Sequence, residues 1–95
     1  PLLSVAMKNQ LQMAELLIKE GANVNARDAG GNNALRLATP AMNPIPMLQL
    51  LVDNGARLDL RDDQGKTALD YALQTGYTKA LSFLRQVSEG GTKEP

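Results

Sequence analysis

The chain of 95 residues contains no cysteine and no histidine. Without cysteine it can form neither a disulfide nor a thiolate metal site, and without histidine it lacks the commonest general base and metal ligand. We therefore expect no catalytic residue, no metal and no cofactor, and we do not expect an enzyme. The lack of cysteine also fits a reducing compartment, so a cytoplasmic location is predicted, with a secreted or periplasmic one left open.

The net charge and the aromatic content of the chain are also low. Ten basic and ten acidic residues give a formal net charge of zero, and aromatic residues make up 3% of the chain. No overall field attracts nucleic acid or an anionic membrane, and too few rings are present to form a platform for stacked bases. No apolar run approaches the length that spans a bilayer. The expected partner is therefore neither nucleic acid nor a membrane.

A repeat runs through the chain. Residues 21–28 (GANVNARD) recur 34 residues later as residues 55–62 (GARLDLRD). The match continues at the same spacing, so that Ala38 corresponds to Ala72. A fixed period of this size predicts stacked supersecondary units, none of which can bury its apolar face alone. Such a stack presents an extended surface rather than a pocket.

Each unit has the same order of local patterns. Residues 28–31 and 62–65 are turn sequences. Asn33 and Thr67 are suitable N-caps for short helices, and Asp70 stands where a capping box needs an acidic residue. A second, longer apolar helix and a short alternating segment follow. The pattern therefore predicts a turn, a short helix, a loop, a longer helix and an extended arm.

The units share a further set of residues in a fixed order. In the second unit these are Asp28, Gly31, Leu35, Ala38, Leu50, Leu51, Gly55 and Ala56. In the third they are Asp62, Gly65, Thr67, Leu69, Ala72 and Gly76. This order resembles the ankyrin repeat, with its pattern Asp-x-x-Gly-x-Thr-Pro-Leu-His-x-Ala before an apolar helix and Gly-Ala-Asp-Val-Asn.

The resemblance covers about residues 1–86 and implies the fold. We expect an all-α solenoid of helix-turn-helix units with short extended turn arms. The repeats are predicted at about residues 1–27, 28–61 and 62–88, and residues 89–95 are predicted to be a disordered C-terminal tail.

The second unit is one residue longer than the commonest ankyrin period. The extra residue falls within residues 39–46, which include three prolines. Pro40 is expected to shorten the first helix, and Asn43 before Pro44 resembles an N-cap followed by the first helical position. The stiff loop is either a rigid epitope for a partner or a tolerated insertion.

The two ends of the array are expected to differ. Arg85 stands at a position that is apolar in the second unit (Val52), which is typical of a terminal cap. Leu2, Val5 and Ala6 lie on a first helix with no polar cap before it. We expect that face to expose apolar surface, which upstream repeats or a short further segment would cover.

The resemblance implies that ligands, usually proteins, contact the turn tips and the exposed side of the first helices. Leu37 and Tyr71 occupy equivalent positions, where they either anchor a partner or pack on neighbouring units. Asp62 and Asp70 are interpreted as structural rather than catalytic. The implied partner-binding residues are Arg27, Asn32, Arg36, Leu37, Arg61, Asp63, Gln64, Lys66, Asp70, Tyr71 and Gln74.

We infer a scaffold that recognises a partner protein non-covalently through its concave face, as a monomer or as part of a longer chain. Two alternatives remain. One is a regulatory or inhibitory protein of the immunity type that occludes a partner's active site. The other is the closing end of a longer array. Asn25 resembles ankyrin asparagines that some oxygenases hydroxylate, but a structural role that ties down the turn is favoured.

Overall fold

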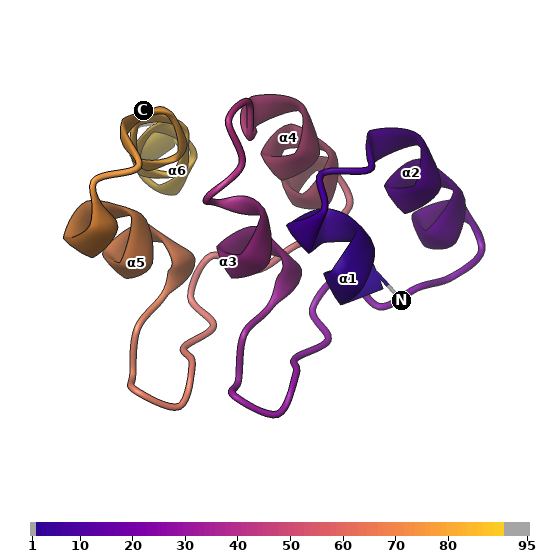
Figure 1. Ribbon diagram of the computed structural model, residues 1–95, viewed down its shortest axis with the longest axis horizontal. Coiled ribbons are helices and arrows are strands. Elements are labelled where there is room, and N and C mark those ends of the chain that lie inside the picture. The colour runs from indigo at the N-terminus through magenta and orange to yellow at the C-terminus, as the bar shows by residue number, and fades with distance from the viewer. Residues whose placement is uncertain (1, 91–95) are drawn as a thin grey trace.

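The computed structural model describes residues 2–90. These residues form six α-helices and no strand, as the sequence predicts for an all-α solenoid. Consecutive helices pair into hairpins that lie side by side (Figure 1). The helices are α1 (Leu2–Met7), α2 (Leu11–Lys19), α3 (Ala34–Ala38), α4 (Ile45–Asp53), α5 (Ala68–Thr75) and α6 (Thr78–Gly90).

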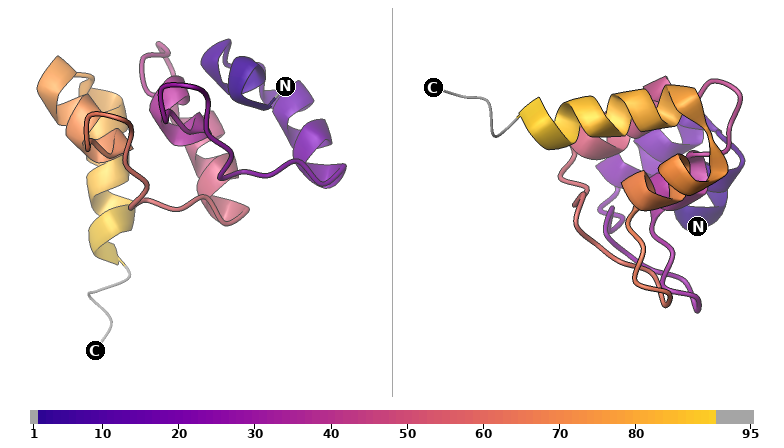
Figure 2. Two further views of the ribbon diagram at one scale, coloured as in Figure 1. Left: turned by 90° about the horizontal axis from the view of Figure 1, so that it is seen from below. Right: turned by 90° about the vertical axis from the view of Figure 1, so that its left-hand side faces the viewer.

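The helices form two layers. The first helices of the hairpins, α1, α3 and α5, lie in one layer, and α2, α4 and α6 lie in the other (Figure 1). Each layer is continuous, because α3 packs against both α1 and α5, and α4 packs against both α2 and α6. The turn arms that join the hairpins project beyond the layer of first helices on one side of the stack (Figures 1 and 2).

Side-chain caps fix the starts of two first helices. The Asn33 side-chain oxygen accepts a hydrogen bond from the Arg36 amide at 3.0 Å, where α3 begins. Thr67 and Asp70 form a reciprocal capping box at α5, with both bonds at 3.1 Å. Each cap satisfies amide groups that have no partner within the helix. Both predicted caps are confirmed, and an aspartate is long enough to complete the box.

The start of α4 differs from the prediction. Its N-cap is Pro44 rather than Asn43, and no side chain caps it. Pro46 lies in the first turn, where the missing amide hydrogen of proline costs no helical hydrogen bond. The helix therefore begins one residue later than Asn43 suggested.

Helix α3 is short, as Pro40 predicts. It has five residues, whereas the equivalent α5 has eight. Thr39 follows α3, is fully buried, and donates a hydrogen bond from its hydroxyl to the Leu35 carbonyl at 2.8 Å. The chain then turns through residues 39–44 into α4. The proline therefore ends the helix, and the buried threonine holds the turn that follows.

The apolar core runs through all three hairpins. Its largest fully buried apolar side chains include Leu35, Met47, Leu48, Leu51 and Leu84, with relative exposures of 1% or less. Leu35 lies on α3, Met47, Leu48 and Leu51 lie on α4, and Leu84 lies on α6. Burial on this scale is the main source of stability in such a stack.

The front of the array corrects one expectation. Leu2, Val5 and Ala6 are buried at 5%, 8% and 0% exposure, because α1 packs against both α2 and α3. Other apolar side chains of the first hairpin are exposed, on both of its helices: Met7, at the end of α1, is 56% exposed. Met13 is 47% exposed and Leu16 is 50% exposed. The prediction that Leu2, Val5 and Ala6 form an exposed apolar face is therefore wrong.

The last helix is longer than predicted. Helix α6 continues to Gly90, so residues 89 and 90, which were assigned to the tail, are helical. Ser88 stands where the second unit has Gly55, and without a glycine to close the helix the chain continues in it. The remaining residues of the predicted tail, 91–95, lie outside the described residues. Arg85 on α6 is exposed, as expected at a terminal cap. The last hairpin also exposes an apolar side chain, because Leu73 on α5 is 60% exposed.

Candidate partner-binding surface

Two turn tips, at residues 28–31 and 62–65, project from the same side of the array (Figure 1). Each tip is held by the aspartate at its start. The carboxylates of Asp28 and Asp62 accept hydrogen bonds from the amides two and four residues later, at distances of 2.8 to 3.0 Å. The pKa of Asp28 is lowered chiefly by the amide of Asn32, and that of Asp62 chiefly by the amide of Lys66. Asp62 therefore holds its turn, as its position in the repeat predicts.

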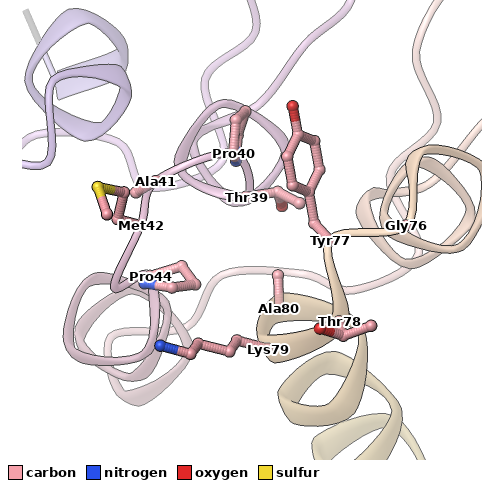
Figure 3. Close-up of a pocket in the computed structure, with 10 residues that line it drawn as sticks. All are labelled: Thr39, Pro40, Ala41, Met42, Pro44, Gly76, Tyr77, Thr78, Lys79 and Ala80. Atoms are coloured by element: carbon pink, nitrogen blue, oxygen red, sulfur yellow. The ribbon is translucent and has the colours of Figure 1, made fainter.

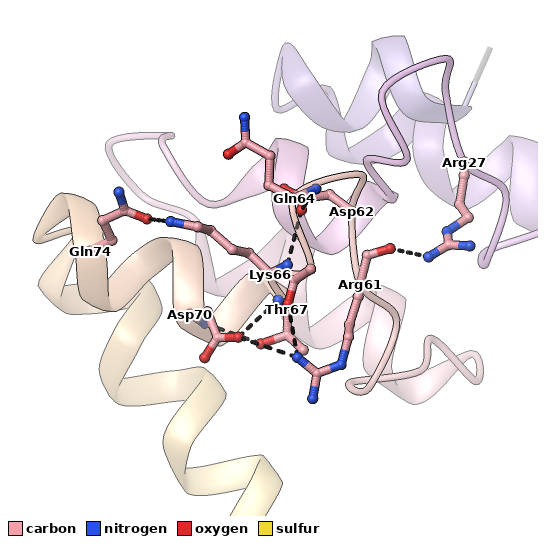
Figure 4. Close-up of polar contacts among 9 residues, drawn as sticks. Arg27, Arg61, Asp62, Gln64, Lys66, Thr67, Asp70 and Gln74 are labelled. Atoms are coloured by element: carbon pink, nitrogen blue, oxygen red, sulfur yellow. Dashed lines mark hydrogen bonds and ion pairs between the residues drawn. The ribbon is translucent and has the colours of Figure 1, made fainter.

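The two tips contact each other directly. The amide of Asp63 donates a hydrogen bond to the Gly30 carbonyl at 3.1 Å. The guanidinium of Arg27 donates to the backbone carbonyl of Arg61 (Figure 4). The neighbouring Gly31 has a φ of +81°, and a Cβ added there would lie 2.8 Å from the Asp63 carboxylate. Glycine is needed at Gly31 for its backbone conformation and for this close approach.

Asn25 joins the first arm to the second. Its side-chain amide donates to the Gly55 carbonyl at 3.2 Å, and its side-chain oxygen accepts from the Arg57 amide at 2.7 Å. Its own amide donates to the Asn23 side chain at 2.9 Å, which stabilises the turn before the tip. The favoured structural role of Asn25 is thus confirmed, and it extends to the next repeat.

An arginine and two tyrosines form a cluster between the second and third hairpins. The Arg36 guanidinium carbon lies 3.4 Å from the centre of the Tyr71 ring. The Tyr77 ring lies 6.0 Å from the Tyr71 ring, tilted by 35°. These are the distances of a cation–π contact and an aromatic pair. We call these three residues the Arg36–Tyr71–Tyr77 cluster.

The Arg36–Tyr71–Tyr77 cluster stays partly accessible. Arg36, Tyr71 and the neighbouring Leu37 are half-buried, and Tyr77 is 38% exposed. Within residues 2–90, the Nε atom of Arg36 is buried without a hydrogen-bond partner. Positive charge on Arg36 also contributes to lowering the pKa of Asp28 and of Asp62, after the hydrogen bonds to those carboxylates. The cluster therefore lies within the electrostatic reach of both tips.

Several predicted binding residues contact one another within the chain (Figure 4). The Lys66 ammonium donates to the Gln74 side chain. The Arg61 guanidinium donates to the Gly65 carbonyl at 2.8 Å and lies 4.0 Å from the Asp70 carboxylate. Both members of that ion pair are exposed, so the pair contributes little stability. Arg61, Lys66, Asp70 and Gln74, which were predicted to contact a partner, thus also contact other residues of the chain.

Three predicted residues at or beside the tips have fewer contacts. The side chains of Asp63 and Gln64 are exposed and form no hydrogen bond to other described residues. The Asn32 side chain donates to the Asp28 carboxylate at 3.3 Å. Sequence reasoning missed Tyr77, which lies between α5 and α6 and so outside the first helices. Its aromatic side chain next to Gly76 was the signal available.

The described residues contain no group of three or more acidic, cysteine or histidine side chains that could hold a metal ion. None of the helices in residues 2–90 is both long and apolar enough to cross a membrane. The surface around the tips offers amide, carboxylate, guanidinium and aromatic groups. Groups of these kinds form hydrogen bonds and packing contacts in protein interfaces generally.

The chain is similar to known repeat proteins. A family model described as ankyrin repeats (3 copies) matches residues 2–93. Among solved structures, the chain is similar to the crystal structure of EF0377, an ankyrin repeat protein, with a TM-score of 0.82 and 31% sequence identity. The match covers 90% of this chain and 45% of that one, so this chain spans less than half of that protein's length. No sequence among the curated proteins matches the chain.

Proposed function

Because the chain belongs to the ankyrin repeat family, we propose that it binds a partner protein through the concave surface of its turn tips and first helices. Ankyrin repeats are generally protein–protein interaction modules and typically not enzymes. The observation that carries the proposal is the Arg36–Tyr71–Tyr77 cluster, which is partly exposed. It lies beside two turn tips that are hydrogen-bonded to each other. Tyrosine and arginine are enriched among the residues that dominate binding energy.

The arrangement favours binding at low entropic cost. The bond from Asp63 to Gly30 and the two bonds of Asn25 hold the arms in place before any partner arrives. Prearranged contact residues lose little freedom on association, so more of the contact energy is retained as affinity. Tyr71 offers an apolar face for packing, and Gln64 offers an amide for hydrogen bonds at the tip. The proposed partner surface is therefore mixed, with an apolar centre and polar groups around it.

The test uses a photo-crosslinking residue placed at Gln64, and a matched control at Gln49. Both glutamines are exposed, but Gln49 lies on α4, in the layer of second helices. In an extract of the source organism, we expect Gln64 to crosslink to a discrete protein and Gln49 not to do so.

The captured protein is then purified, and its affinity for the wild-type chain, for Tyr71→Ala and for Arg36→Ala is measured by calorimetric titration. We expect the dissociation constant to rise by about tenfold, as for a residue that dominates an interface. Crosslinking from Gln49 alone, or an unchanged affinity in Tyr71→Ala and Arg36→Ala, would contradict the proposed surface.

Two narrower statements remain predictions. The chain is expected to act as a monomer or as part of a longer chain, which sedimentation of the purified chain and of its full reading frame would check. A cytoplasmic location is expected from the lack of cysteine, and cell fractionation would check it.

A further inference from the structure

A second concavity lies away from the turn tips. It is formed where the α3–α4 connection meets the start of α6 (Figure 3). The turn arms leave from the other ends of these helices (Figure 2). The volume is about 320 Å³. This is near the lower limit of the usual range for ligand sites, about 300–1,000 Å³, so it suits one or two side chains. We call it the connection groove.

One wall of the connection groove is rigid. Pro40, Ala41 and Pro44 belong to the loop that the extra residue of the second unit lengthens. Pro44 is fully buried, and the proline rings fix two of the backbone angles in this loop. Thr39 anchors the loop through its bond to the Leu35 carbonyl. A wall of this kind loses little entropy when it is covered.

The opposite wall carries an aromatic ring and one charge. Tyr77 presents its ring beside Pro40, and the Lys79 side chain runs along the edge of the groove toward Pro44 (Figure 3). Among residues 2–90, no carboxylate forms an ion pair with Lys79. The groove is thus lined mainly by apolar atoms, with a single unpaired ammonium at its edge. Met42, which is 94% exposed, adds a flexible side chain to the rim.

We propose that the connection groove binds a short segment of a partner protein in which an apolar side chain lies next to a carboxylate. The apolar side chain packs between the proline loop and Tyr77, and the carboxylate pairs with the Lys79 ammonium. Charge complementarity favours this occupant, because the exposed Lys79 ammonium attracts a carboxylate and repels a basic segment. The groove shares Tyr77 with the Arg36–Tyr71–Tyr77 cluster, but its test depends on Lys79, which is not part of that cluster, so its failure would leave the proposed function intact.

The test uses phenylbutyrate as the probe and its neutral counterpart phenylbutyramide as the control ligand. Both are titrated into the ¹⁵N-labelled chain and followed by NMR. We expect saturable shifts at the amides of Ala41, Tyr77 and Lys79, and binding of the carboxylate about fivefold tighter than binding of the amide, as for one exposed ion pair.

Three variants test whether the preference for the carboxylate depends on the positive charge of Lys79. Lys79→Gln should abolish the preference for the carboxylate, and Lys79→Arg should retain it. Lys19→Gln is the matched control, because Lys19 is an exposed lysine on α2 that does not line the groove. Equal affinity for the two probes, shifts outside the groove, or no saturable shift would overturn the inference. Loss of the preference in Lys19→Gln would also overturn it.

Discussion

Replacing Gly31 by alanine should destabilise the chain more than the same replacement at Gly65. The two glycines have almost the same backbone conformation, with φ of +81° and +80°. Alanine in this left-handed region costs roughly 1–2 kcal/mol at either position. The conformational penalty therefore cancels when the two variants are compared, and only the surroundings of the new methyl group differ.

The surroundings differ sharply. At Gly31, the added Cβ would lie 2.8 Å from the Asp63 carboxylate, 2.9 Å from the Asp63 nitrogen and 3.1 Å from the Asp62 Cα, whereas at Gly65 nothing lies within 4 Å. Two of the three atoms near Gly31 belong to the backbone, so rotating a side chain cannot relieve the clash. The tips must separate, which breaks the bond from the Asp63 amide to the Gly30 carbonyl.

Loss of that hydrogen bond costs about 1 kcal/mol. Remaining strain adds to it, so Gly31→Ala should lower the free energy of unfolding by about 1–2 kcal/mol more than Gly65→Ala. That difference is measurable against a total stability of about 5–15 kcal/mol.

The assay is urea unfolding of both variants, followed by far-ultraviolet circular dichroism. Hydrogen exchange at the Asp63 amide adds a local readout, and it should accelerate in Gly31→Ala but not in Gly65→Ala. If both variants lost the same stability, or if the Asp63 amide stayed protected in Gly31→Ala, the contact between the tips would be refuted.

Three further predictions follow from burial, bridging and charge. Met47→Ala should cost about 2–4 kcal/mol and Met13→Ala under about 1 kcal/mol in urea unfolding, because the first side chain is fully buried and the second is 47% exposed; equal costs would contradict the stacking. Asn25→Ala should cost about 1–2 kcal/mol and speed hydrogen exchange at the Arg57 amide, since two bonds between arms are lost; unchanged exchange would refute the bridge. Because the folded pKa of Asp28 and of Asp62 is lowered, the stability that they contribute is complete above the ordinary aspartate pKa of about 3.9, and it is lost as the pH falls through the folded values. The melting temperature of the wild type should therefore fall more steeply below about pH 4 than that of Asp28→Asn. Parallel plots of melting temperature against pH for the two proteins would contradict this.

Local patterns predicted most of the fold. The caps at Asn33 and Thr67 depend on residues three positions apart, and the short α3 depends on one proline, so both are readable from the chain. The burial of Val5 was not readable in this way. Its burial depends on α3, which packs over α1 from nearly 30 residues away along the chain. The error at the front of the array therefore arose because burial there depends on the neighbouring hairpin, whereas the errors at Asn43 and at the end of α6 concern local helix ends.

The candidate surface was less predictable than the fold. The resemblance indicated the tips and first helices, but it could not show which side chains already pair within the chain. The contact between Lys66 and Gln74 joins a turn to a helix, and the contact between Arg36 and Tyr71 joins two repeats. Such pairs depend on rotamers and on the spacing between repeats, neither of which appears in the linear pattern.

The bridge made by Asn25 affects how the array bends. Directional bonds join the arms along one edge of the stack, whereas apolar packing, which has no preferred direction, joins the helices behind them. We therefore expect thermal bending to change the separation of the helices more than the separation of the arms. A ligand that spans neighbouring arms would find the same separation whether the array is more or less curved.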